Sequence, residues 1–183
     1  YELLKKKTWK PIIGNNLKNK KIGIVGFGKI GSKLFQLLKV MNCKTFVFEK
    51  KKLNNKNIRK FPLKTIFRKC DVVCICLNLN NTTKNIINYD ILKKANKDII
   101  IINASRGNII NENDLFKFLK NNINASAFLD CFVKEPYYGK LLKQKNIYPI
   151  PHIASFTQET RKEMEISASK NLIRYLIKIE KKK

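Results

Sequence analysis

Three side chains in the second half of the chain could together move a proton on a substrate that carries a carboxylate: Arg106, Glu135 and His152. Arginine can hold a carboxylate through two parallel hydrogen bonds. Histidine exchanges a proton near neutral pH, and a nearby carboxylate would orient its ring and stabilise its charged form. The structural alternatives are a surface ion pair for Arg106 and an ordinary surface or core position for His152, the only histidine. Glu135 could simply cap the turn before Pro136.

A second group of residues has the chemistry of a phosphate site. The stretch from Gly26 to Gly31 reads Gly-Phe-Gly-Lys-Ile-Gly, follows a predicted strand and opens a predicted helix, which is the context that this motif requires. Gly26 permits a tight turn, Gly28 lets the backbone approach a pyrophosphate, and Gly31 allows close packing of helix on strand. The N–H groups at the helix start would then bind the anion.

Glu49 ends the second predicted strand, close to the spacing of about 20 residues at which such folds place a ribose-binding acid. Its carboxylate would accept hydrogen bonds from the ribose hydroxyls and repel a 2′-phosphate, which favours NAD over NADP. The lysines at 50–52 weaken this preference because they could attract a phosphate. The structural alternative is that Glu49 is only a solvated residue at the end of a strand.

The elements that would position these residues alternate along the chain. Apolar segments bounded by turn signals predict strands, and segments of helical periodicity predict helices. The expected strands are 21–26, 45–49, 71–76, 99–102, 125–130 and 147–150, and the expected helices are 30–41, 63–70, 89–95, 113–119 and a long one from about 157. This alternation predicts an α/β fold, a Rossmann-type doubly wound parallel sheet with helices on both faces. The proposed chemical residues follow strands, at the edge that forms the ligand crevice.

Three further segments strengthen the interpretation: Asn-Ala-Ser-Arg-Gly at 103–107, Leu-Asp-Cys-Phe-Val-Lys-Glu-Pro at 129–136 and Pro-His-Ile-Ala-Ser at 151–155. With the glycine turn, they resemble the D-isomer-specific 2-hydroxyacid dehydrogenases over nearly all of residues 1–175. The resemblance implies an NAD-dependent oxidoreductase that interconverts a D-2-hydroxy acid and a 2-keto acid. It gives Arg106, Glu135 and His152 the roles of carboxylate anchor, histidine partner and proton donor.

The expected cofactor is NAD. By resemblance, Asp130 contacts the nicotinamide carboxamide side, and Lys29 and Ile30 contribute to pyrophosphate binding. Many family members have a His-x-Pro segment after the strand at 71–76, where this chain has Cys76, so contacts at that edge of the cofactor stay open. The residues expected to bind NAD are Gly26, Gly28, Lys29, Ile30, Gly31, Glu49, Leu77, Ala104, Ser105, Asp130, Ala154 and Ser155.

The resemblance also predicts the domain organisation. Residues 1–20 are interpreted as a linker and the end of a connecting helix from a substrate domain that this sequence lacks. Residues 21–156 are the NAD-binding Rossmann domain, and 157–183 form a C-terminal helix that packs back toward the substrate domain and ends in a lysine tail. Because the chain begins at Tyr1 rather than Met, we expect its true N-terminus to lie upstream.

The segment from Ser155 to Met164, with Glu159 and Arg161, resembles members that act as phosphoglycerate dehydrogenases. We therefore predict a 3-phosphoglycerate dehydrogenase-like enzyme. Glyoxylate or hydroxypyruvate reduction, and a non-catalytic NAD-sensing module like the family's transcriptional corepressors, stay open. Because family members usually dimerise through this domain, we expect a homodimer with a small 2-hydroxy or 2-keto acid as substrate.

The net charge of +26 invites a nucleic-acid function. Lysine is spread along the whole chain, however, and its abundance with Asn and Ile fits A/T-rich codons. No nucleic-acid-binding motif is present, so we expect no such partner. The five cysteines include no Cys-x-x-Cys pair, so no metal site is expected. No apolar run approaches the roughly 18 residues of a membrane span and no signal-peptide pattern is present, so we expect a cytoplasmic protein.

Overall fold

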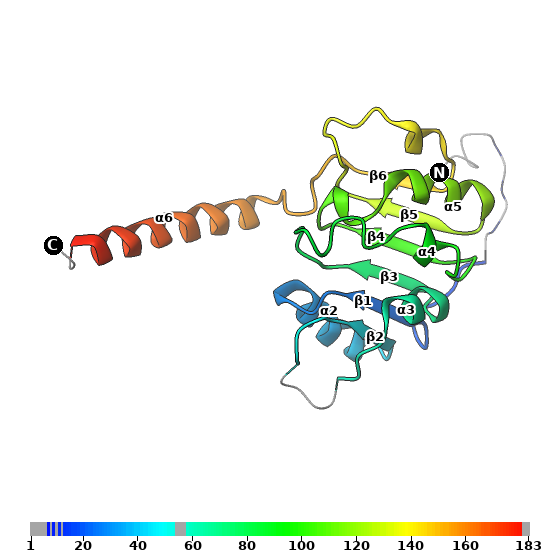
Figure 1. Cartoon of the computed structure of the whole chain (residues 1–183), viewed down its shortest axis with the longest axis horizontal. Coiled ribbons are helices and arrows are strands. Elements are labelled where there is room, and N and C mark those ends of the chain that lie inside the picture. The colour runs from blue at the N-terminus through cyan, green and yellow to red at the C-terminus, as the bar shows by residue number, and fades with distance from the viewer. Residues whose placement is uncertain (1–6, 8, 10, 12, 54–57, 181–183) are drawn as a thin grey trace.

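A computed structural model describes residues 7, 9, 11, 13–53 and 58–180. The predicted connecting-helix end near Glu2 and the lysine tail at 181–183 lie outside the described residues. The described part folds around one parallel sheet of six strands, in the order β2-β1-β3-β4-β5-β6 (Figure 1). The strands are β1 (Lys21–Val25), β2 (Lys44–Phe48), β3 (Val72–Ile75), β4 (Ile100–Asn103), β5 (Ser126–Leu129) and β6 (Ile147–Pro149).

The helices alternate with the strands, and all but the last of them lie between one strand and the next, as the predicted β-α-β units require. They are α2 (Lys29–Val40), α3 (Leu63–Lys69), α4 (Tyr89–Leu92), α5 (Glu112–Asn121) and α6 (Gln158–Glu180), with short 3-10 helices η1 (Gly107–Ile109) and η2 (Lys140–Lys143). Every predicted strand and helix is present, with ends that shift by a few residues. Gly26, predicted as part of the first strand, lies outside β1 because its φ of 100° breaks the extended backbone.

The apolar core lies on both faces of the sheet, which confirms the predicted Rossmann-type arrangement. On one face, α3, α4 and α5 cover the fully buried Val73, Ile101 and Ala127. On the other, α2 packs on β1 and β2 around Ile24 and Val47. Among the described elements α2 is the only helix on that second face, so Phe128 and Tyr148 stack there with 42% and 49% of their surface exposed.

Helix α6 leaves the carboxyl edge of the sheet and extends away from it (Figure 1). None of its residues is buried, and apolar side chains such as Leu172, Ile173 and Leu176 are at least half exposed. No helix in the described ranges is both long enough and apolar enough to cross a membrane. The carboxyl ends of the strands, where α6 departs, are also where the predicted site residues gather.

Candidate active site

The glycine turn after β1 has the geometry of a phosphate cradle. A Cβ at Gly26 would lie 2.6 Å from the carbonyl oxygen of Cys76, and a Cβ at Gly31 would overlap the carbonyl oxygen of Gly26. These two glycines therefore permit the tight turn and the close seating of α2. Gly28 has open space around its Cβ position and caps α2 without any side-chain hydrogen bond. The backbone at the start of α2 is thus accessible to an anion, which fits a pyrophosphate.

Glu49 braces this turn from the end of β2. Its Oε2 accepts the N–H of Phe27 at 2.8 Å, and its Oε1 accepts the N–H of Lys51 at 3.0 Å. Partial burial alone would raise the pKa of Glu49, but the hydrogen bonds from Lys51 and Phe27 lower it overall below the ordinary 4.5. The carboxylate is therefore ionised at neutral pH, as a ribose-binding acid must be.

A crevice of about 770 Å³ opens above the turn. Its lining includes Gly28, Lys29, Ile30, Glu49 and Leu77. The side chains of residues 50–52 also border this crevice, and Lys50 donates to the carbonyl of Thr82 across it at 3.0 Å. The crevice is therefore lined both by Glu49, which would favour NAD, and by the lysines at 50–52, which would favour NADP.

Arg106 projects from a turn that a buried asparagine holds in place. Asn103, at the end of β4 and only 1% exposed, donates from Nδ2 to the carbonyl of Arg106 at 3.0 Å. Its Oδ1 accepts from the N–H and the hydroxyl of Ser105. These hydrogen bonds hold the backbone of Arg106 in a defined position, from which its side chain extends into solvent. Ser105, predicted to bind the cofactor, uses its side chain within this turn.

His152 and Glu135 form a direct pair. Nδ1 of His152 lies 2.8 Å from Oε2 of Glu135, and Oε1 of Glu135 accepts the N–H of Phe132 at 2.9 Å. The hydrogen bonds from His152 and from Phe132 hold the pKa of Glu135 below 4.5, and the guanidinium of Arg106 adds a smaller effect in the same direction. An ionised carboxylate can only accept, so Nδ1 carries the proton and Nε2 is the ring atom left for a substrate.

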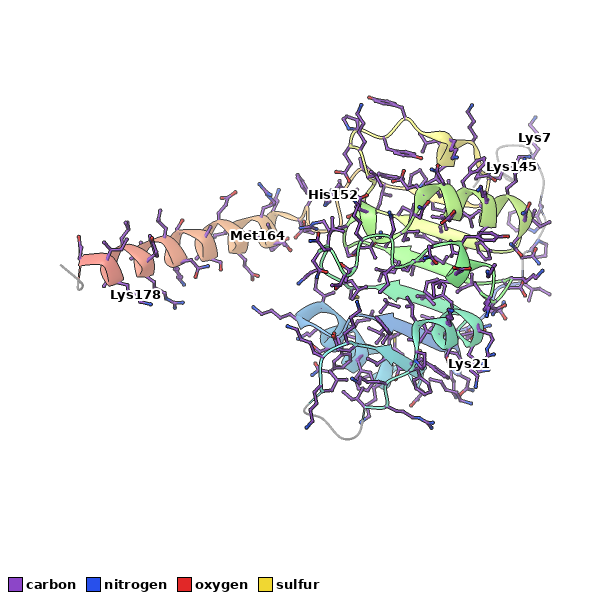
Figure 2. The ribbon with its side chains drawn as sticks, in the orientation of Figure 1. Lys7, Lys21, Lys145, His152, Met164 and Lys178 are labelled. Atoms are coloured by element: carbon purple, nitrogen blue, oxygen red, sulfur yellow. The ribbon has the colours of Figure 1, made fainter. Side chains whose placement is uncertain are left out.

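The backbone around His152 is unusual and is held by Asp130. His152 has a φ of 53°, in the left-handed region that costs a non-glycine residue about 1–3 kcal/mol. Asp130, at the end of β5 and 4% exposed, accepts the N–H groups of Ile153 and Ala154 at 2.6 and 3.0 Å. These bonds offset the strain and fix the histidine at the junction of the sheet with α6 (Figure 2). The predicted carboxamide contact of Asp130 stays a prediction.

The loop that carries Glu135 packs tightly on the turn that carries Arg106. A Cβ at Gly107 would overlap the carbonyl group of Phe132. Glu112, the first residue of α5, accepts the N–H of Val133 at 2.7 Å. Sequence reasoning missed these supporting residues. Gly107 could have been found from its place beside Arg106, but nothing in the sequence connects Glu112 to Val133.

The predicted residues gather in two places along one edge of the sheet. The glycine turn, Glu49 and Leu77 form the crevice, while Arg106, Asp130, Glu135 and His152 form the second cluster. Ala104 and Ser155 are exposed, and in the described ranges no hydrogen bond joins the Ser155 side chain to either group. A separate cavity of about 580 Å³ borders His152 and Glu135, with an apolar lining that includes Phe132, Tyr137, Leu142 and Ile150.

The five cysteines are free thiols in the structure. Within the described part of the chain, no three Cys, His, Asp or Glu side chains come together as ligands. Burial raises the pKa of Cys76 to about 11 and that of Cys131 to about 12, so both are neutral thiols at physiological pH. Cys76 borders the cofactor crevice at the point where many family members have a histidine segment.

Comparison with known proteins agrees with this arrangement. Residues 1–154 match the family described as D-isomer specific 2-hydroxyacid dehydrogenase, NAD binding domain. The chain belongs to this family. The match confirms the predicted family and its NAD cofactor, and it includes the glycine turn, Glu49, Arg106, Glu135 and His152. The 2-hydroxyacid dehydrogenase fold thus brings the predicted residues to one edge of its sheet.

Individual relatives give further detail. The glyoxylate reductase of Thermococcus litoralis is 34% identical over 174 residues, which are 91% of this chain and 53% of that protein. The glyoxylate/hydroxypyruvate reductase B of Cronobacter sakazakii is 34% identical over 170 residues, 89% of this chain and 52% of that protein. A solved acyclic imino acid reductase in complex with NADPH and D-Arg has a TM-score of 0.88 and 25% identity, covering 97% of this chain and 58% of that one. The chain therefore spans about half the length of the curated relatives it matches.

Proposed function

We propose that this chain is the cofactor-binding half of an NAD-dependent reductase that converts glyoxylate or hydroxypyruvate to the corresponding 2-hydroxy acid. The observation that carries the proposal is the 2.8 Å pair of His152 and Glu135, on the loop packed against the turn of Arg106. A proton donor, its carboxylate partner and a carboxylate anchor are the groups that reduction of a 2-keto acid requires beside the hydride donor.

The residues divide the work as follows. Arg106 holds the substrate carboxylate with the keto carbon facing the cofactor crevice, where NADH, once bound, would be the source of the hydride. His152, protonated on both nitrogens, gives its Nε2 proton to the oxygen that gains negative charge, so a hydroxyl forms and the ring becomes neutral. Glu135 accepts the hydrogen bond from Nδ1–H of His152, which keeps this proton on the ring and stabilises the imidazolium before the transfer. In the oxidative direction, neutral His152 takes the hydroxyl proton at Nε2.

We propose glyoxylate or hydroxypyruvate, rather than 3-phosphoglycerate, as the substrate class. The resemblance around Glu159 and Arg161 predicts a phosphoglycerate dehydrogenase. Both residues are exposed on α6, outside the crevice and the second cluster, so their positions lend this prediction no support. The names of the relatives support the alternative prediction, glyoxylate or hydroxypyruvate reduction, better than the main one. The basic charge does not decide between them, because lysine is distributed over the whole chain.

A second domain is proposed to complete the site. The relatives are about twice as long as this chain, and reaction in a closed space between two domains excludes water from the hydride. We propose that α6, with its exposed apolar side chains, packs against that substrate domain, and that the complete protein is a homodimer. The chain by itself should then bind NADH and reduce keto acids slowly.

The test is to measure NADH binding by calorimetry and NADH oxidation in the presence of glyoxylate, hydroxypyruvate and 3-phosphohydroxypyruvate. Turnover highest with glyoxylate or hydroxypyruvate, and lost in His152→Gln while NADH still binds, is the expected result. Highest turnover with the phosphorylated acid would return the function to the phosphoglycerate class. NADH binding without turnover in any form of the protein that contains both domains would favour the non-catalytic sensing module.

A further inference from the structure

Glu112 is a half-buried acid that the proposed mechanism does not use. It begins α5, and its Oε1 accepts the N–H of Val133 at 2.7 Å. Acids at the first turn of a helix are commonly explained by the helix dipole. That explanation does not require a hydrogen bond to a loop 21 residues away.

Three contacts hold the backbone of the segment Phe132–Val133. Its carbonyl side rests against Gly107, where even a Cβ would not fit. The N–H of Phe132 donates to Oε1 of Glu135 at 2.9 Å, and the N–H of Val133 donates to Glu112. Each contact restrains a different atom of the same short segment, so together they define how this segment is oriented.

This segment connects the two halves of the second cluster. Gly107 directly follows Arg106, and Glu135 directly contacts His152. If the segment turned about its axis, Oε1 of Glu135 would follow the N–H of Phe132, and Oε2 would move away from Nδ1 of His152. An acceptor on the N–H of Val133 opposes that rotation, because this N–H donates to Glu112 on α5 while the N–H of Phe132 donates to Glu135.

We propose that Glu112 is a positioning residue that orients the Phe132–Val133 segment, so that Glu135 bonds Nδ1 of His152 and leaves Nε2 for proton transfer. Its effect on the reaction rests on the proposed function. Its effect on the histidine ring does not, and can be measured without substrate or cofactor. The chain is suited to this measurement because His152 is its only histidine.

The experiment reads the tautomer of neutral His152 from the ¹⁵N resonances of its ring at mildly alkaline pH. The wild-type chain is expected to hold the proton mainly on Nδ1, and Glu135→Ala is the reference for loss of that preference. Glu112→Ala should move the tautomer ratio at least halfway toward the Glu135→Ala value. Glu112→Gln, whose amide oxygen can still accept from Val133, should stay close to wild type.

Two further variants separate positioning from general destabilisation. Asn113→Ala removes the exposed neighbour of Glu112 on the same helix turn and should leave the ratio unchanged. Glu112→Asp keeps the charge at the helix start but withdraws the acceptor, so it should shift the ratio even if Glu112→Ala does not fold. A wild-type tautomer ratio in folded Glu112→Ala or Glu112→Asp, or a Glu112→Gln that behaves like Glu112→Ala, would overturn the proposal.

Discussion

Oε2 of Glu135 lies 2.8 Å from Nδ1 of His152, although the two residues come from loops after different strands. The pair is partly exposed, with 38% and 43% of the two side chains accessible. It therefore contributes little to the stability of the fold, because exposed pairs are screened by water, and its main effect is to orient the imidazole ring.

The Glu135 carboxyl should make stability depend on pH in the acid range. Its pKa is lowered in the folded chain, chiefly by the hydrogen bond from His152, so its contribution is present above the ordinary value of 4.5 and is lost as the pH falls through the lowered value. The contribution is small, about 0.2–1 kcal/mol for an exposed pair. The unfolding temperatures of wild type and Glu135→Gln should differ at roughly neutral pH. The two temperatures should converge as the pH is lowered. A difference in unfolding temperature that grows toward low pH would contradict the predicted loss of the Glu135 contribution on acidification.

Two glycines of the nucleotide turn should respond differently to alanine. Gly31→Ala would place a Cβ against the carbonyl of Gly26 and force α2 outward, which should cost about 1–3 kcal/mol of unfolding free energy and weaken NADH binding. Gly28→Ala has space for its Cβ and an ordinary φ of −77°, so the fold should be retained while the methyl obstructs the pyrophosphate. Denaturant unfolding and calorimetry measure the two effects separately. Equal NADH affinity in Gly28→Ala and wild type would argue against the cradle.

Asn103 should be important for both the fold and the placement of Arg106. Asn103→Ala leaves the carbonyl of Arg106 and the N–H of Ser105 without their buried partner, which should cost about 1–3 kcal/mol. Asn113→Ala is the exposed control, expected within about 0.5 kcal/mol of wild type. Denaturant midpoints compare the two variants. Similar midpoints would show that water replaces the asparagine in the turn.

The preference between NADH and NADPH should depend on Glu49. We expect tighter binding of NADH, because the ionised carboxylate repels a 2′-phosphate, and loss of this preference in Glu49→Ala. Calorimetric titration with each cofactor at moderate salt makes the comparison. Tighter binding of NADPH by the wild-type chain would mean that the lysines at 50–52 outweigh the acid.

Much of the fold could be predicted because its signals are local. The alternation of apolar and helical segments predicts the six strands in their correct places, and the glycine turn predicts the start of α2 within a residue. The sequence predicts the ends of helices and strands less well, because these depend on where backbone hydrogen bonding to neighbouring segments stops. Gly26 shows this: it continues the apolar run of β1 in sequence, but its positive φ takes it out of the strand.

The sequence by itself determined the residue types of the site and the edge of the sheet where they lie, because side chains that follow parallel strands share one edge. Only the tertiary structure decided which groups touch. The left-handed backbone of His152, its anchoring by Asp130 and the contact of Glu112 with Val133 join residues from different loops. Such contacts are fixed by the packing of one loop on another, which has no periodicity in the sequence and becomes visible only when the chain is folded.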